Sequence, residues 1–328
     1  VIPGGARWLR ARVSAFEPER NAIVLEDGRR VHYGALVVAP GLELHWDGVE
    51  GLTETLGRNG VTSNYDIDCA PYTWKLVQQL RSGRAVFSQP PMPIKCAGAP
   101  QKALYLSCDA WRRAGVLDRI EVSFHNAGGV LFGVPDYVPP LERTIEGYGI
   151  DLRLKERLVA VDGGTRTATF ELGDGTHRNV EFDLLNVVPP QRSPAFVRDS
   201  GLADEGGWLA ADPATLRHPR HGNVFTLGDV AGTGNAKTAA AVRKQAPVVA
   251  TNVLQVLEGR EPTAAYDGYG SCPLILERGR VVLAEFGYGG RLLPTFPNWL
   301  FDGRRPSRMG WWLKAGFMPW IYFDLMLR

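Results

Sequence analysis

The chain has 328 residues, which is enough for about two domains of ordinary size. Apolar residues make up 45% of it and charged residues 22%, a composition typical of packed globular proteins that excludes general disorder. The net charge is only +2, so we expect no nucleic-acid partner, because binding phosphates requires a basic surface. The four cysteines and six histidines show no metal-ligand spacing, and we predict no metal site and no disulfide scaffold.

Alternating apolar residues predict strands near the start of the chain. The pattern places them at residues 7–16, 22–26 and 30–33, with a hairpin turn at Asp27-Gly28 between the last two. The next segment, 35–39, is continuously apolar and ends at Pro40-Gly41. Such a run is typical of a strand that is buried on both faces, as in a parallel sheet.

Strands and helices alternate in the middle of the chain. We predict strands at 84–88, 120–126 and 150–154, with helices at 101–114 and 139–147 between them. This order predicts an α/β protein with a doubly wound sheet.

A meander and a second set of buried elements follow. Strands at 158–161, 167–172 and 179–182 are predicted to form the meander, and the apolar run 184–188 returns to a buried strand. A further buried strand at 223–227 is followed by a long helix at 236–257. The two halves share the order of meander, apolar strand and turn, so we predict two related nucleotide-binding domains.

The C-terminal segment 310–328 is dense in aromatic residues. Lys314, Pro319 and Asp324 interrupt it, so it is too short and too broken to span a bilayer. Its Trp and Tyr residues suit a membrane interface, and the alternative is a helix packed on the protein's own core.

Asp229 is a candidate cofactor ligand because it follows the buried strand 223–227. Ligands of open α/β sheets bind at the carboxyl ends of the strands, where a carboxylate can accept hydrogen bonds from ribityl hydroxyls. The helix that begins near Lys237-Thr238 would point the positive end of its dipole at an electron-rich group. The alternative is an aspartate that caps a helix within a loop.

Cys96 is a candidate nucleophile. No Gly-X-Gly-X-X-Gly motif occurs in the chain, and Pro100 offers no N–H group to a phosphate, so we predict that the second domain does not bind NAD. The sequence presents a thiol there instead. Lys95, Lys102 and a helix N-terminus would lower the pKa of this thiol. The alternative is an inert buried cysteine.

Three segments carry a resemblance to a known family. The stretch 94–102, Gly228-Asp229 and the segment 237–242 resemble the sulfide:quinone oxidoreductases of mitochondria and related bacteria. The resemblance extends over essentially the whole chain, and the further matching segments are 63–65, 266–269, 271–274, 283–286 and Met318-Pro319.

The resemblance implies an enzyme of the disulfide-reductase type with bound FAD. Its fold would be two Rossmann-like three-layer domains with a short C-terminal membrane-associating segment. Sulfide would attack a redox disulfide, a persulfide would form, and two electrons would pass through the flavin to a membrane quinone. The implied partners are therefore sulfide, a sulfur acceptor and a membrane quinone. The resemblance also implies peripheral attachment to a membrane, without deciding which side of it. It allows a homo-oligomer but does not fix the oligomeric state.

The resemblance also implies a division of the chain and a set of site residues. Residues 1–80 and 189–265 would form the FAD domain, 81–188 the domain with the redox cysteine, and 266–328 the quinone and membrane region. Cys96 would be one redox cysteine, and Phe286 would contact the quinone. The residues expected at the cofactor are Val13, Ala39, Gly41, Lys102, Gly228, Asp229, Lys237 and Thr238.

Two departures from the family pattern are expected to matter. The second redox cysteine is expected directly after Gly228-Asp229, where this chain has Val230. Either sulfide chemistry is lost, giving a flavoprotein or pseudoenzyme of the same fold, or another thiol serves. We expect Cys69 to be that thiol, with Cys272 second. The glycine fingerprint of the FAD domain is also missing, so we expect a fragment truncated at its N-terminus.

Overall fold

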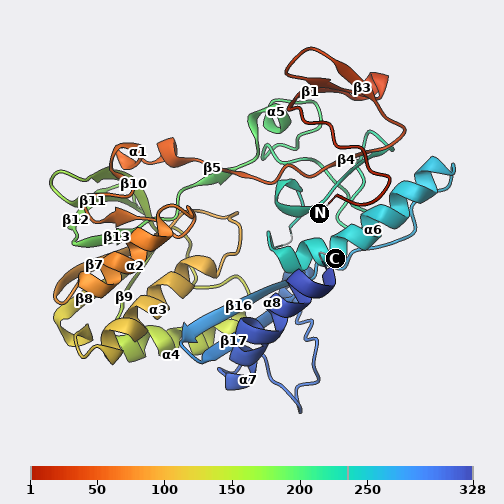
Figure 1. Cartoon of the computed structure of the whole chain (residues 1–328). Coiled ribbons are helices and arrows are strands. Elements are labelled where there is room, and N and C mark those ends of the chain that lie inside the picture. Colours follow the sequence, from red (N-terminus) through yellow and green to blue (C-terminus); the bar gives the residue numbers. More distant parts are fainter. Residues whose placement is uncertain (1, 235, 327–328) are drawn as a thin grey trace.

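The computed structural model describes residues 2–234 and 236–326. Within these residues, a five-stranded parallel sheet occupies one half of the molecule (Figure 1). Its strand order is β6-β13-β7-β8-β9, and every neighbouring pair is parallel. The strands are β6 (Val61–Thr62), β7 (Gly83–Gln89), β8 (Ile120–Asn126), β9 (Asp151–Leu154) and β13 (Leu184–Asn186).

Helices connect these strands, as the alternating pattern predicts. The predicted helices are confirmed as α3 (Ala99–Arg113) and α4 (Val138–Tyr148). A further helix, α2 (Ala70–Gln79), was not predicted, and it precedes β7. Because β6 lies before residue 81 and still pairs with β13, the sheet draws strands from both sides of the expected boundary. The four-part division of the chain itself stays a prediction.

The alternation of side chains along β7 explains why the sheet is covered on both faces. Ala85 and Phe87 point into one apolar cluster with residues of α3 and α4, whereas Val86 belongs to a second cluster on the other face. The second face is covered by the predicted meander, whose Phe170 is fully buried there. The meander strands are β10 (Glu156–Asp162), β11 (Thr167–Leu172) and β12 (His177–Glu181).

The other half of the molecule contains smaller sheets and a long helix. Its strands are β1 (Val13–Glu17), β2 (Ala22–Leu25), β3 (Arg30–His32), β4 (Leu36–Val38), β5 (Glu43–Leu44), β14 (Gln191–Arg192) and β15 (Val224–Thr226). β4 and β15 are parallel partners, and α6 (Ala239–Leu257) follows β15. The prediction of a strand from residue 7 is corrected, because residues 7–12 are exposed and the strand begins at Val13.

An antiparallel hairpin that was not predicted lies between the two halves (Figure 1). It consists of β16 (Gly270–Glu277) and β17 (Arg280–Phe286), and β16 contacts both α3 and α6. The C-terminal segment runs along β17 as consecutive helical turns. These are α7 (Arg308–Trp312), η7 (Leu313–Phe317), α8 (Met318–Trp320) and η8 (Ile321–Met326).

The predicted C-terminal aromatic segment is therefore helical as far as Met326, and its last two residues lie outside the described ranges. Within the described ranges, no helix combines the length and the apolar character needed to cross a bilayer. The remaining short helical segments are α1 (Leu52–Thr55), α5 (Ala195–Arg198), η1 (Pro18–Arg20), η2 (Trp46–Gly48), η3 (Leu117–Arg119), η4 (Pro135–Tyr137), η5 (Gly228–Val230) and η6 (Tyr288–Gly290).

Candidate functional site

Cys96 lies in the turn between β7 and α3, two residues before the Gly98 N-cap of the helix. Its backbone has a left-handed φ of 51°, a conformation that L-residues other than Asn and Asp rarely adopt. The backbone N–H of Cys96 donates to the Lys237 carbonyl at 2.9 Å, and the Cys96 carbonyl accepts from the Ala99 N–H at 2.7 Å. The turn is thus fixed both by its own helix and by a segment more than 100 residues away.

The turn brings two sulfurs and an ammonium group together. The Cys96 sulfur lies 3.5 Å from the sulfur of Cys272, which is in β16, and 3.2 Å from Nζ of Lys102, one turn into α3. Cys272 is fully buried, whereas Cys96 is half-buried. This is a pair of thiols of unequal access with a cation beside one of them.

The surroundings separate the pKa values of the two thiols. A hydrogen bond from Cys272 lowers the pKa of Cys96 against the opposing effect of burial, and the Lys102 charge lowers it further. The same hydrogen bond, together with burial, raises the pKa of Cys272. Burial acts to lower the pKa of Lys102, but the two sulfurs outweigh it and the net shift is upward. Of the two thiols, Cys96 is therefore the one that ionises more readily.

Gly98 makes the close approach of the two cysteines feasible. A Cβ atom at residue 98 would lie 2.6 Å from the Cys272 sulfur and would overlap a methyl group of Leu274. The absence of a side chain therefore lets the start of α3 pack directly on β16.

The structure places a different thiol beside Cys96 from the one expected, and the redox role expected for Cys69 stays a prediction. The thiol beside Cys96 is Cys272 and not Cys69, which is buried at the start of α2, where its carbonyl accepts hydrogen bonds from Thr62 and Thr73. Val230 lies in another environment, fully buried in an apolar cluster. Although residue 230 is a valine, Cys96 still has a thiol neighbour, because the β16–β17 hairpin supplies Cys272.

Four of the residues expected at the cofactor lie at one edge of the β4–β15 pair. In this parallel pair Thr226 lies opposite Val38, so the turns that follow both strands are adjacent. These turns contain Ala39 and Gly41 after β4, and Gly228 and Asp229 after β15. Val13 is instead paired with Leu25 in the three-stranded β1–β3 sheet, and its role stays a prediction.

Two polar side chains at this edge are suited to hold a ligand. Burial raises the pKa of Asp229, while the charges of Lys237 and Lys95 oppose the shift. Gln245 is fully buried in α6, where its Oε1 accepts from the Gly228 N–H at 2.8 Å. Its Nε2 has no hydrogen-bond partner among residues 2–234 and 236–326. A desolvated carboxylate next to an unpaired buried donor fits the polar groups of a flavin nucleotide.

Lys237 joins this edge to the cysteine pair. Its ammonium donates to the Asp229 carbonyl at 2.5 Å and lies 3.8 Å above the Trp208 ring, and burial lowers its pKa to about 8. Its own carbonyl accepts the Cys96 N–H. Thr238, the next residue, caps α6 by accepting from the Ala241 N–H.

Two further residues with expected roles, Phe286 and Lys102, lie in different surroundings. Phe286 ends β17 opposite Gly270, and its ring packs edge-on against Phe132. A Cβ atom at Gly270 would touch both Phe286 and Ala236, so Phe286 lies close to the Lys237 segment. Lys102, which was expected at the cofactor, contacts the Cys96 sulfur.

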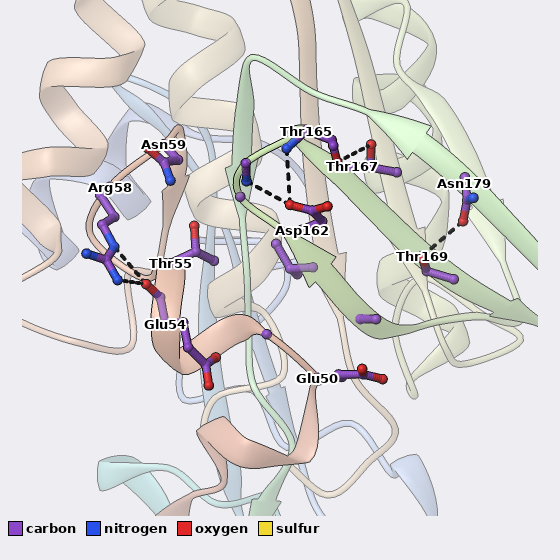
Figure 2. Close-up of a pocket in the computed structure, with 15 residues that line it drawn as sticks. Glu50, Glu54, Thr55, Arg58, Asn59, Asp162, Thr165, Thr167, Thr169 and Asn179 are labelled. Atoms are coloured by element: carbon purple, nitrogen blue, oxygen red, sulfur yellow. Dashed lines mark hydrogen bonds between the residues drawn. The ribbon is translucent and has the colours of Figure 1, made fainter.

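A cavity of about 890 Å³ lies elsewhere, between α1 and the meander (Figure 2). Figure 2 shows Arg58 turned back onto the Glu54 carbonyl and Asp162 holding its own turn through the backbone N–H groups of Gly164 and Thr165. The cysteine pair and Asp229 do not line it. We therefore place the candidate site at Cys96, Cys272 and the Asp229 edge.

The sequence shows extensive similarity to characterised proteins, although no family model matches it. It is 38% identical over 329 residues to a mitochondrial sulfide:quinone oxidoreductase of Dictyostelium discoideum, covering 100% of this chain and 72% of that protein. The mouse (Mus musculus) protein of the same name is 36% identical over 330 residues, with 100% and 73% covered. The fold resembles the crystal structure of the sulfide:quinone oxidoreductase from Aquifex aeolicus, with a TM-score of 0.79 at 18% identity, covering 96% of this chain and 74% of that one.

Proposed function

The chain belongs to the sulfide:quinone oxidoreductase family, and from this premise we propose that Cys96 and Cys272 are the redox pair with which it oxidises sulfide. The observation that carries the proposal is the 3.5 Å separation of their sulfurs. Thiols this close can be joined by a disulfide after a small movement. The half-buried position of Cys96 leaves a path for a small anion to the pair.

The unequal pKa values decide how hydrosulfide would react with the oxidised pair. A thiol of low pKa is the better leaving group in thiol–disulfide exchange. Hydrosulfide therefore attacks the Cys272 sulfur, a new S–S bond forms there, and the bond between Cys272 and Cys96 breaks. The electron pair of the broken bond leaves with Cys96 as a thiolate beside Lys102, and Cys272 carries the persulfide.

A sulfur acceptor then completes the sulfur balance. Its nucleophilic atom bonds to the outer sulfur of the Cys272 persulfide, and Cys272 is released as a thiolate. A bound FAD would supply the two-electron acceptor that returns the dithiol to a disulfide and passes the electrons to a quinone. Asp229, Gly228 and Gln245 are the residues that would hold it, and Lys237 orients the Asp229 turn relative to Cys96.

The quinone and membrane roles belong to the same proposal. Phe286 would form part of the quinone contact, and the C-terminal helical segment would rest on the membrane surface without crossing it. The support is the row of exposed apolar side chains there, which include Trp312, Trp320 and Phe323. The alternative of a flavoprotein without sulfide chemistry rests on Val230, and the position of Cys272 beside Cys96 favours sulfide oxidation over it.

Cysteine replacement tests the proposal directly. In the purified flavin-loaded protein, we expect Cys96→Ser and Cys272→Ser each to reduce sulfide-dependent reduction of a short-chain quinone by roughly 10³-fold, because neither variant can form the disulfide. The control is Cys108→Ser, a buried thiol of α3, and Cys69→Ser should also retain activity within about twofold. Full activity in Cys272→Ser would refute the pair, and loss in Cys69→Ser alone would assign the role to that residue.

A further inference from the structure

The turn that carries Cys96 is held by side chains that come from two other segments. Tyr65, between β6 and α2, donates its hydroxyl hydrogen to the Lys95 carbonyl at 2.9 Å and lies 3.5 Å from the Cys96 carbonyl. Gln191 of β14 accepts the Lys95 N–H with its Oε1 at 2.7 Å. Both backbone polar groups of Lys95, the residue before Cys96, are thus held by side chains, and these come from residues that are far apart in the sequence.

Such anchoring is physically required at this position. A left-handed backbone at a residue with a side chain is unfavourable and persists only where the surroundings determine it. Cys96 has neither the small polar side chain of Asn nor the freedom of Gly to make that conformation easy. If the turn relaxed to an extended or right-handed conformation, the direction of the Cys96 side chain would change, and its sulfur would leave the space between Lys102 and Cys272.

We propose that Tyr65 and Gln191 are positioning residues, which hold the Lys95–Cys96 backbone so that the Cys96 sulfur faces Lys102 and Cys272. This inference rests on the proposed role of Cys96 and Cys272 as the redox pair. Neither residue acts on sulfide itself: Tyr65 works through the two carbonyl groups, and Gln191 works through the Lys95 N–H.

The properties of Tyr65 agree with a constant structural donor. Burial and the neighbouring cysteine charges raise the pKa of its phenol, which favours the protonated hydroxyl that donates to the Lys95 carbonyl. Among residues 2–234 and 236–326, the titratable groups that interact with the Cys96 sulfur are Lys102 from α3, Cys272 from β16 and Tyr65. The Lys95 ammonium faces the ring of Tyr65, 5.7 Å from the centre of that ring.

The test is the pH dependence of Cys96 alkylation in the reduced holoenzyme. The rate of reaction with iodoacetamide is followed at each cysteine by peptide mass spectrometry between pH 4 and pH 9. We expect Tyr65→Phe to raise the midpoint for Cys96 by about one pH unit, which corresponds to a roughly tenfold slower reaction below the midpoint. The matched control is Tyr72→Phe, which loses a hydroxyl that accepts from the Gly60 N–H at 3.0 Å and should leave the midpoint unchanged.

The outcomes separate this inference from the proposed function. An unchanged midpoint in Tyr65→Phe, or a rate that falls equally at every pH, would overturn the positioning role even if Cys96→Ser abolishes sulfide oxidation. Gln191→Met is the second variant. If circular dichroism shows that Tyr65→Phe does not fold, the alkylation midpoint of Gln191→Met tests the positioning role instead. This second variant should shift the midpoint in the same direction, and no shift would also overturn the inference. Because alkylation needs neither sulfide nor quinone, a failure of the proposed function would leave this measurement readable.

Discussion

Lys102 shows how a single side chain sets the chemistry of the site. Its ammonium lies 3.2 Å from the Cys96 sulfur, and both groups are partly removed from water. A charge interaction is stronger in such surroundings than at an exposed surface, because the effective dielectric constant is lower. The local sequence predicted that Lys102 would lower the pKa of Cys96, and the 3.2 Å contact agrees with that prediction. The further role expected for Lys102 at the cofactor stays a prediction.

Replacing Lys102 by Met should raise the pKa of Cys96. In the native protein the pKa is lowered, so the thiolate is present above that value and lost as the pH falls through it. Without the ammonium the protonated thiol persists to higher pH, and thiolate formation shifts upward by about one unit or more. The measurement is the ultraviolet absorbance of the thiolate in the reduced protein as a function of pH. Lys75→Met, on the exposed face of α2, is the control, and identical titrations of both variants would contradict the prediction.

The β16–β17 hairpin and α3 form the site only because they pack in direct contact. Cys272 and Leu274 lie on the same face of β16, since residues two apart in a strand point the same way, and that face meets Gly98. The helix N-terminus therefore presents backbone, and not a side chain, to the second cysteine. The spacing of the two sulfurs is a property of this contact between elements and not of either element alone.

Gly98→Ala should disrupt that contact. The added methyl group would overlap Leu274 and approach the Cys272 sulfur, so the hairpin must move away from α3. We expect a loss of about 1–3 kcal/mol in the free energy of unfolding, which is typical of overpacking, and a loss of sulfide-dependent activity.

Gly147→Ala is the matched control for this substitution. Residue 147 lies inside α4, and a Cβ atom there would meet no neighbour within 4 Å. Alanine should therefore raise stability by about 0.5–1 kcal/mol through its helix propensity. Urea unfolding measures both variants, and equal midpoints for the two would show that the contact at Gly98 is not tight.

On the scale of the whole molecule, the C-terminal helical segment differs from the rest of the surface. It packs on β17 through Gly310 and leaves a series of large apolar side chains exposed, among them Trp312, Trp320 and Leu325. Exposed apolar area of this kind marks an interaction surface in a protein of ordinary composition. Phe286 ends β17, the strand on which α7 packs, and this contact connects the proposed membrane contact with the proposed quinone contact.

Trp320→Ala should weaken binding to phospholipid vesicles, because the lost indole ring is one of the side chains that would enter the interface. Trp74→Ala in α2 is the matched control, since Trp74 is 55% exposed and Trp320 is 53% exposed. Co-sedimentation with vesicles of zwitterionic phospholipid measures both, and we expect a severalfold loss only for Trp320→Ala. An equal loss for the two variants, or none for either, would count against the C-terminal segment as the membrane contact.

Local patterns in the sequence determined much of this protein. The periodicity of apolar residues predicted the meander and, in chain order, β7, α3, β8, α4 and β9. This was possible because a helix or strand that buries one face, or both, needs apolar residues at regular intervals along the sequence. A cysteine with cations at a strand–helix turn was recognisable for the same reason, since all its determinants lie within a few residues. The segment 94–102 also carried the family resemblance that the comparisons bear out.

Tertiary structure alone decided which thiol stands beside Cys96 and which side chains hold its turn. Cys272 is 176 residues away from Cys96, and no periodicity or spacing links the two positions. The same holds for Tyr65 and Gln191, which lie 30 residues before Lys95 and 96 residues after it. Contacts of this kind depend on how the hairpin and the sheets pack against α3, and packing is a property of complementary shapes that no local stretch of sequence records.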